Sequence, residues 1–331
     1  MILLLSNDGD LSCDLVQNWL SALSYPWIRL NAFDFIKAKL DIILTSDSEY
    51  KITIDGEIFP IDKINAVWFR KFGFFRCSEI YTQLLNKQKL DDIALSFTVK
   101  EFATVLDTLC DALRNKYWLT DPENVHINKI KILRFAQECG LLIPDTSITN
   151  NAEYLYYINQ NLISKSIYDP TIASWGQENR CMMYTTRISN EDIKNIPAKF
   201  LPSMVQNLIE KKLEIRTFYL DGDCYSMAIF SQKDSATKLD FRCYNWSKPN
   251  RYVPYKLDRA VELKIKVLMT KVGLNCGSLD FIMDTQGNLY FLEINPTGQF
   301  GMVDFPCNYN LHKKVAEKLI QMDNNHARTS L

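Results

Sequence analysis

The strongest constraint on the fold lies near the end of the chain, in two apolar segments at positions 278–283 and 289–295. A short polar stretch containing Asp, Gly and Asn separates them, and this pattern predicts two strands joined as a β-hairpin. Both predicted strands also carry polar residues among Leu, Ile and Phe; these residues are Asp280, Glu293 and Asn295. The hairpin therefore constrains a possible site as well as a fold.

The expected register of this hairpin brings the polar residues together. Glu293 and Asn295 are two positions apart, so their side chains share a face. A tight loop after Asp284 pairs this residue with Leu289 and places Asp280 opposite Glu293. The side chains then offer oxygen ligands on one face, as suits Mg²⁺ with phosphate oxygens completing its octahedron. The alternative is that these acids lie on the solvent face of a half-exposed hairpin, since buried carboxylates without a cation are costly.

Four basic residues occupy positions that suit the binding of an anion. Lys129 lies at a helix start after Asn128, and Lys165 lies in an apolar strand. Arg216 shares a strand face with Glu214, and Arg242 follows a polar stretch. A helix start attracts anions through its unpaired N–H groups, and a Lys there adds a point charge. Each residue alone is explained equally well as a surface charge. Together with the acidic hairpin, they indicate a nucleotide triphosphate held by Lys, Arg and Mg²⁺.

Residues 1–75 alternate strand and helix. Apolar runs predict strands at 2–5, 27–30 and 67–70, with an amphipathic helix over 11–23. An Asp-Gly pair at 55–56 predicts a tight hairpin. This region is expected to be a small α/β unit of the nucleotide-fold kind, without the G-x-G-x-x-G fingerprint of dinucleotide binding. Two basic residues end its last strand, and we favour solvated edge charges over binding of an acidic peptide for them; they are Arg70 and Lys71.

The rest of the chain is richer in strands. Two predicted strands, 162–167 and 182–188, form an antiparallel pair. A second group of strands is expected at 204–209, 213–220 and 224–230. Helices are expected at 87–115, 129–139, 257–272 and 312–322, and the last nine residues are expected to fray.

Composition narrows the classes of function. The chain has 38 Lys+Arg against 39 Asp+Glu and a net charge of −1, so it lacks the basic surplus that duplex binding needs. Nine scattered Cys fit a reducing cytosol, and three His are too few for a His-based metal site. No apolar run approaches the roughly 20 residues of a membrane span. We expect a cytoplasmic protein that binds neither nucleic acid nor membranes.

The ordered set of residues resembles the ATP-grasp superfamily over roughly residues 115–320. The order is Asn128-Lys129, Lys165, a strand-hinge-strand at 206–210, Glu214-Ile215-Arg216, Asp280, and Glu293-Ile294-Asn295-Pro296. Three further segments are similar to those of ATP-grasp peptide maturases, including microviridin-type ligases and the grasp-with-spasm group; they are 1–6, 67–71 and 293–300. Such enzymes install side-chain ester or amide crosslinks in ribosomally made peptides, which gives graspetides.

The resemblance implies an ATP-grasp fold, mixed α/β and α+β, with a small N-terminal α/β domain of the pre-ATP-grasp kind. The implied domains are an N-terminal domain with a long helix, a central ATP-grasp subdomain, and a C-terminal subdomain carrying the magnesium site; their bounds are 1–115, 116–205 and 206–331.

The resemblance also assigns roles within the site. Lys129 and Lys165 are implied to hold the α- and β-phosphates of ATP, and Glu214 to accept from the ribose hydroxyls. The implied hinge, whose backbone reads the adenine edge, consists of Gln206, Asn207 and Leu208, although core packing explains Leu208 equally well. Mg²⁺ is implied to bind Asp280, Glu293 and Asn295. Arg216 is implied to stabilise the transferring phosphoryl group, with assistance from Arg242.

The expected partner is a precursor peptide with a leader segment, and the enzyme is expected to be a homodimer. The alternative function is a carboxylate–amine ligase that acts on a small metabolite or adds glutamate to a protein. A third possibility is a non-catalytic ATP- or peptide-binding partner, against which the intact acidic set and both lysines argue.

Overall fold

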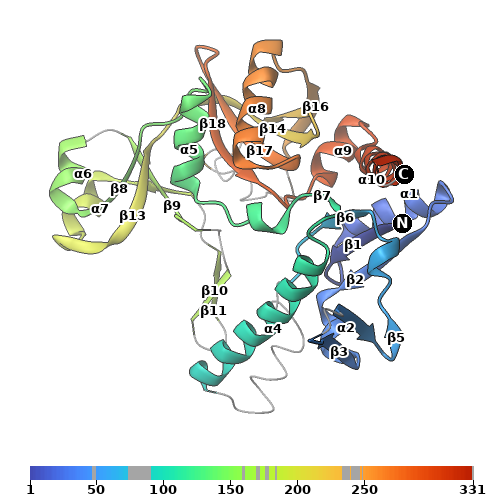
Figure 1. Cartoon of the computed structure of the whole chain (residues 1–331). Helices are drawn as coiled ribbons and strands as arrows, with labels where there is room; N and C mark the ends of the chain where they lie inside the picture. The colour runs from blue at the N-terminus through green and yellow to red at the C-terminus, as the bar shows by residue number, and fades with distance from the viewer. Residues whose placement is uncertain are drawn as a thin grey trace. The chain divides into compact units, whose positions relative to one another are not determined.

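The computed structural model describes residues 1–46, 50–73, 91–158, 161–168, 172–175, 179–182, 185–232, 239, 247 and 249–329. The chain divides into two compact units (Figure 1). Unit 1 comprises Met1–Val125 and Asn310–Leu331, and unit 2 comprises His126–Tyr309. Among the described helices, none is both long enough and apolar enough to cross a membrane.

Unit 1 is built on a four-stranded parallel sheet with the order β2-β1-β6-β7. Its strands are β1 (Ile2–Ser6), β2 (Trp27–Asn31), β6 (Ala66–Phe69) and β7 (Tyr117–Leu119). Every residue of β1 and β6 is buried, as expected of parallel strands covered on both faces. These strands confirm the α/β unit predicted for residues 1–75.

Three long helices pack on this sheet, and they are α1 (Leu11–Ala22), α4 (Asp92–Ala112) and α10 (Leu311–Thr329). Apolar side chains of α4 form one buried cluster with alternate residues of the sheet; the cluster includes Leu106, Leu109, Leu3, Leu5 and Val67. Helix α10 contacts α1 and also β1, β6 and β7. The expected fraying after residue 322 was wrong up to Thr329, because Asp323 is buried and accepts a hydrogen bond from the Tyr25 hydroxyl at 2.6 Å.

A second, three-stranded sheet of unit 1 contains the predicted hairpin. It has the order β3-β4-β5, with β3 (Leu40–Leu44), β4 (Tyr50–Ile54) and β5 (Glu57–Ile58). Asp55 and Gly56 form the turn with φ values of +52° and +84°, the left-handed conformation that Asp-Gly turns favour. Short helical segments complete the unit; they are α2 (Ala32–Lys37), η1 (Ile61–Lys63) and η3 (Pro122–Asn124).

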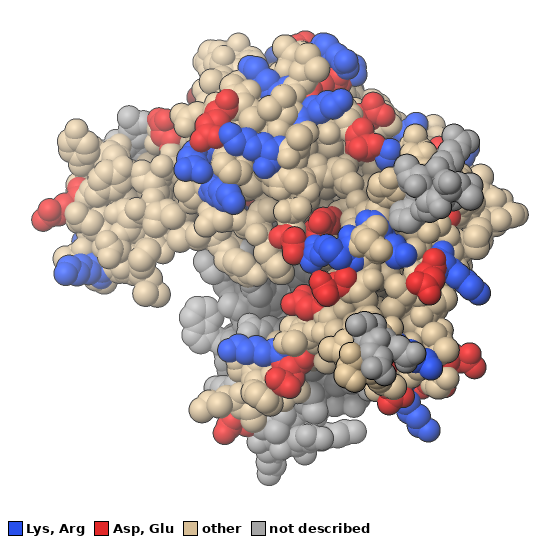
Figure 2. All heavy atoms as spheres, in the orientation of Figure 1, with Lys and Arg blue, Asp and Glu red and all other residues tan. Residues whose placement is uncertain are grey.

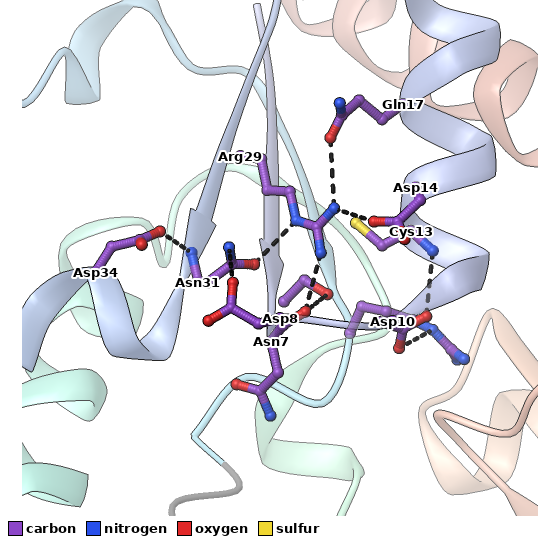
Figure 3. A network of polar contacts seen from close by, with 11 residues as sticks. Asn7, Asp8, Asp10, Cys13, Asp14, Gln17, Arg29, Asn31 and Asp34 are labelled. Atoms are coloured by element: carbon purple, nitrogen blue, oxygen red, sulfur yellow. Dashed lines mark hydrogen bonds and ion pairs between the residues drawn. The ribbon is translucent and has the colours of Figure 1, made fainter. Parts of the chain in front are cut away.

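A polar network lies at the carboxyl ends of β1 and β2 (Figure 3). Arg29 is its centre: the guanidinium donates to Asp14, to the Asn31 side chain at 2.9 Å, and to the backbone oxygen of Asn7 at 2.9 Å. Asn31 in turn donates to Asp8 at 2.9 Å. The network ties the first loop of the chain to the second strand.

Arg70, which follows β6 in the same sheet, is buried with only 3% of its surface exposed. Its Nε lies 3.3 Å from a carboxylate oxygen of the equally buried Asp10. The expectation of a solvated edge charge was therefore wrong for Arg70. Burial, together with the neighbouring charge of Arg70, lowers the pKa of Lys71 below its ordinary value.

Unit 2 contains two main antiparallel sheets, one of four strands and one of five (Figure 1). The smaller has the order β12-β9-β13-β8, with β8 (Thr146–Asn151), β9 (Leu162–Lys165), β12 (Thr186–Ile188) and β13 (Lys199–Asn207). Helices α6 (Ala152–Ile158) and α7 (Asn190–Asn195) belong to this region. A separate two-stranded hairpin consists of β10 (Ile172–Trp175) and β11 (Asn179–Met182).

The larger sheet has five strands in the order β16-β15-β14-β17-β18. They are β14 (Lys211–Leu220), β15 (Asp223–Phe230), β16 (Arg251–Tyr255), β17 (Cys276–Asp284) and β18 (Leu289–Asn295). The expected grouping of residues 204–209 with the strands at 213–220 and 224–230 was wrong, because β13 pairs with β8 and β9 instead. Residues 208–210 interrupt the strand pattern between β13 and β14 and so separate the two sheets.

One face of the larger sheet forms the core of unit 2. Helices α5 (Lys129–Glu138) and α8 (Arg259–Val272) pack there, and Figure 1 shows both beside this sheet. A third helix of the unit, α9 (Gly301–Cys307), contacts β14, β15 and β16. The buried cluster joins alternate strand residues to the helices; it includes Ile215, Leu279, Phe291, Leu133 and Leu268. Asn128 caps α5, since its side chain accepts from the Lys131 N–H at 3.0 Å, and Gly273 ends α8 at φ +79°.

The two units divide the chain differently from the three domains predicted. Unit 1 continues to Val125, and it includes the C-terminal helix α10, which the prediction had grouped with residues 206–331. The reason is that α10 packs on the parallel sheet and α1 of unit 1.

On the face shown in Figure 2, basic and acidic side chains lie intermingled among uncharged ones.

Phe291 provides a test of the core of unit 2. It is fully buried, and its ring lies edge-on against Phe281 at 5.6 Å between centroids. We expect Phe291→Ala to lower the free energy of unfolding by roughly 3–5 kcal/mol, through lost burial and the cavity it leaves. Urea denaturation measures this loss. Leu263→Ala, at an α8 position that is 50% exposed, is the control and should change stability by less than about 1 kcal/mol; equal losses in both variants would contradict the assignment of the core.

Candidate active site

The acidic hairpin forms as β17 and β18, with Asp280 opposite Glu293 and Ser278 opposite Asn295. The predicted meeting of Asp280 and Glu293 is confirmed. The predicted pairing of Asp284 with Leu289 was wrong, because an irregularity after Asp280 shifts the register by one residue and Met283 takes that place.

Asp284 instead organises the turn. Its carboxylate accepts hydrogen bonds from the backbone N–H groups of Gln286 at 2.9 Å and Asn288 at 2.8 Å, and from the Asn288 side chain at 2.8 Å. Burial pushes the pKa of Asp284 up, but these hydrogen bonds outweigh it and hold the pKa below its ordinary value. A carboxylate that closes its own turn this way gains more than it would from continuing the strand.

Asp280 is held by a cation from the neighbouring strand. Arg216 on β14 is its register partner, and the Arg216 Nη1 lies 3.0 Å from both Asp280 carboxylate oxygens. The two side chains are only 11% and 14% exposed. The Asn295 amide nitrogen also donates to Asp280 at 3.2 Å. Three of the predicted site residues thus contact one another directly.

Glu293 connects the sheet to the start of α5. Its carboxylate lies 3.6 Å from the Lys129 Nζ, and the same ammonium donates to the backbone oxygens of Ser166 and Tyr168 at 3.2 Å. Lys129 is the first residue of α5, where its charge joins the unpaired N–H groups of the helix. The structure therefore brings Lys129, Glu293, Asp280, Asn295 and Arg216 into one connected polar group on the face opposite the helix-covered core.

Glu214 lies on the same strand face as Arg216 but in a different contact group. Its carboxylate contacts Lys211 and accepts from the Ser231 hydroxyl at 2.9 Å. Lys211 is 7% exposed and also donates to the backbone oxygen of Leu239 at 3.1 Å. Sequence reasoning missed Lys211; the available signal was a Lys three residues before Glu214 at the start of an apolar strand.

Of the predicted hinge residues, Gln206 and Asn207 end β13, and Leu208 lies in the link to β14. Gln206 is 2% exposed and donates to the Thr146 hydroxyl at 2.8 Å, while the Asn207 amide donates to Asp145 at 2.9 Å. The Leu208 N–H donates to the backbone oxygen of Asn161 at 2.7 Å, so this group is already engaged. Asn207 and Leu208 border a hollow of about 690 Å³ whose other lining residues are Asn161, Arg187, Ile188, Ser189 and Asn190.

The structure describes only one of the other two predicted basic residues, Lys165 and Arg242. Lys165 ends β9 and pairs in register with Met204 of β13, so it belongs to the smaller sheet. Arg242 lies outside the described residues.

The donor set at the hairpin fits a hard divalent cation. Asp280 and Glu293 supply carboxylate oxygens and Asn295 supplies an amide oxygen, the ligand types that Mg²⁺ prefers. Among the described residues, no three His, Cys, Asp or Glu side chains gather to form a metal site. A cation here therefore uses two carboxylates and one amide, and it leaves positions for phosphate or water oxygens.

Comparisons with known proteins concern the fold of the chain. Residues 1–126 match the family model of the MvdD pre-ATP grasp domain. The whole chain is similar to macrocyclase MdnC from Microcystis aeruginosa MRC, solved with the precursor peptide MdnA, at 26% identity and a TM-score of 0.81; the match covers 97% of this chain and 99% of that one. A search among curated protein sequences gave no match.

Other solved structures share the fold. The RiPP-associated ATP-grasp ligase from Chryseobacterium gregarium, solved with ADP and a leader and core peptide, is 23% identical with a TM-score of 0.83, and the match covers 97% of this chain and 96% of that one. Macrocyclase MdnB from Microcystis aeruginosa MRC is 24% identical with a TM-score of 0.72, and the match covers 96% and 98% of the two chains.

The fold, the N-terminal match and these similarities define the chain as an ATP-grasp ligase with a pre-ATP-grasp N-terminal domain. The N-terminal match and the similarity to a macrocyclase confirm the resemblance to ATP-grasp graspetide ligases that was seen in the sequence.

The Arg216–Asp280 pair gives a prediction about stability. Removing one partner leaves the other charge mostly buried without its counter-ion, so Asp280→Asn should lower the free energy of unfolding by roughly 2–4 kcal/mol. Replacing both partners, as in Arg216→Met/Asp280→Leu, removes both buried charges and should cost less than the single change. Urea denaturation of both variants without nucleotide or metal measures this difference. A double variant less stable than Asp280→Asn would show that the pair is not the interaction that matters.

Proposed function

We propose that the chain is an ATP-dependent peptide ligase that forms graspetide crosslinks. It activates side-chain carboxylates of a ribosomally made precursor peptide and joins them to Thr or Ser hydroxyls or to Lys amines. The observation that carries the proposal is the connected group of Lys129, Glu293, Asp280, Asn295 and Arg216 on an ATP-grasp sheet. The similarity to macrocyclases solved with their precursor peptides supports the choice of substrate.

The proposed cofactors are ATP and Mg²⁺. Solved relatives of the same fold contain ADP and Mg, which supports this choice. Asp280, Glu293 and Asn295 hold the metal, which neutralises phosphate charge when bound. Lys129 and Lys165 hold the α- and β-phosphates. The adenine edge is read by backbone groups of Gln206, Asn207 and Leu208 other than the Leu208 N–H, which already donates to Asn161. Glu214 accepts from the ribose.

The reaction follows from the chemistry of carboxylate activation. A substrate carboxylate oxygen attacks the γ-phosphorus of ATP, the bond to the β-phosphate oxygen breaks, and ADP leaves. A hydroxyl or amine of the peptide then attacks the acyl carbon, loses its proton, and expels phosphate. Arg216 stabilises the charge that develops in these steps, because a guanidinium can bind two oxygens at once. Arg242 is proposed to assist it.

The competing function is a carboxylate–amine ligase for a small metabolite or a protein terminus. Its support is a shared fold with D-alanyl-alanine synthetase A from Vibrio cholerae O1, at 15% identity and a TM-score of 0.59. Macrocyclase MdnC and the RiPP-associated ATP-grasp ligase match the fold more closely, with TM-scores of 0.81 and 0.83. We therefore place the peptide substrate first. The family resemblance further suggests a leader-bearing precursor, a homodimeric enzyme and a cytoplasmic location.

The dependence of ADP release on a peptide tests the function. With ATP and Mg²⁺, the chain should release ADP when given a precursor peptide rich in Thr and Asp or Glu, and the product should lose one water per crosslink by mass spectrometry. Glu293→Gln should abolish both signals, because the metal site loses a charge. ADP release with free amino acids alone would favour the metabolite ligase instead, and no release with any substrate would refute the proposal.

Arg216→Lys separates catalysis from nucleotide binding. A Lys cannot bridge two oxygens in the manner of a guanidinium, so we expect kcat to fall by ~10²–10³ while ATP affinity stays within a few-fold. Single-turnover crosslinking of the peptide measures the rate, and calorimetry measures the affinity. Lys212→Arg, an exposed position on the same strand, is the control. Crosslinking by Arg216→Lys at the wild-type rate would end the catalytic assignment of this residue.

A further inference from the structure

The segment after β18 turns back sharply onto the metal-binding face. Pro296 and Thr297 follow Asn295, and the Gly298 N–H donates to the Asn295 backbone oxygen at 3.1 Å. A methyl group added to the Gly298 Cα would lie 3.0 Å from the Asn295 Cβ, 3.0 Å from the Ser278 Cβ and 3.0 Å from the Ser278 Oγ. The backbone of Gly298 thus fits against two side chains that face each other across β17 and β18.

Space, and not backbone conformation, requires glycine at this position. Several glycines of the described chain have positive φ values, including Gly273 and Gly287, but Gly298 is not among them. An alanine could adopt its backbone conformation without strain. The three nearest contacts, each at 3.0 Å, oppose a side chain here.

The two neighbours differ in how far they can move. Ser278 is fully buried on β17, which is held on both sides by β14 and β18. Asn295 is the last residue of β18 and only partly buried, so it yields more easily. Its amide nitrogen donates to Asp280 at 3.2 Å, so a displaced Asn295 changes its position relative to the carboxylate beside it.

We propose that Gly298 and Ser278 are positioning residues that hold the Asn295 side chain against Asp280 in the orientation needed for a divalent cation. This inference rests on the proposed magnesium site. Ser278 supplies a fixed wall, and Gly298 supplies a backbone that approaches without a Cβ. Neither residue contacts the metal in this assignment; each acts through Asn295.

Gly298→Ala tests the proposal through metal binding. We expect it to weaken Mn²⁺ binding by about tenfold, measured by electron paramagnetic resonance on the full chain with ADP, which is the scale for residues that orient a metal ligand. ADP affinity measured in EDTA should stay within twofold of wild type. The thermal midpoint of unfolding should stay close to that of wild type. If Gly298→Ala folds but Mn²⁺ affinity, ADP affinity and the thermal midpoint all fall together, that result would overturn the positioning role.

Two further variants sharpen the test. Ser278→Gly/Gly298→Ala removes two of the three nearest contacts, and the added methyl group takes the place of the Ser278 side chain as the wall beside Asn295, so Mn²⁺ affinity should return to within about threefold of wild type. Gly277→Ala is the matched control, because a methyl group there meets its neighbours at 3.4–3.5 Å, an ordinary contact distance, and Mn²⁺ binding should not change.

The outcomes separate this inference from the function it rests on. Wild-type Mn²⁺ affinity in Gly298→Ala would overturn the inference and leave the ligase intact. A wild-type chain that binds no Mn²⁺ with ADP would refute the proposed metal site itself, and the inference with it. If Gly298→Ala fails to fold, the double variant decides: folding with near wild-type Mn²⁺ affinity supports the inference, and folding with affinity tenfold weaker overturns it.

Discussion

The ion pair between Arg216 and Asp280 is the interaction on which the candidate site depends. The two residues are register partners on adjacent strands, and both carboxylate oxygens lie 3.0 Å from the same guanidinium nitrogen. Charges that are mostly shielded from water attract strongly, but each is costly if its partner is lost. The pair therefore fixes Asp280, and Asp280 accepts from Asn295. Lys129 holds the neighbouring Glu293 in the same way, so each of the two acids has its own base.

The two faces of the larger sheet explain how this charged group is tolerated. Alternate residues of each strand point to opposite faces. One set, including Ile215, Leu279 and Phe291, is closed against α5 and α8. The residues of the opposite face take no part in this core, so Arg216 and Asp280 can lie there without exposing it. The Gly298 backbone lies close to Asn295 and so limits the movement of this side chain, which is one of the three proposed metal ligands.

Unit 1 uses a different arrangement of charge. The two central strands of its parallel sheet, β1 and β6, are buried on both faces, so its charged residues lie on the outer strand β2 and in the loops that follow β1 and β6. There Arg29 is held by Asp14 and Asn31, and Arg70 faces Asp10. Each of these acids lies within reach of a specific base, which gives the loops a defined position. The return of α10 to this sheet closes the unit with a segment that is distant in sequence.

The sequence by itself determined the features that depend on neighbouring residues. The hairpin period placed Asp280 opposite Glu293, and the caps at Asn128 and Gly273 bounded their helices. The ordered motifs also resembled the correct superfamily. The sequence did not reveal the register shift after Asp280, nor the hydrogen bonds by which the Asp284 carboxylate closes its own turn.

Only the tertiary structure decided which distant segments meet. It paired Arg216 with Asp280, placed β13 in the smaller sheet, and brought Gly298 against Ser278. Strand periodicity says which face a side chain takes, but not which strand lies beside it. That choice depends on how the apolar faces of all the elements are buried together, and it is a property of the whole fold.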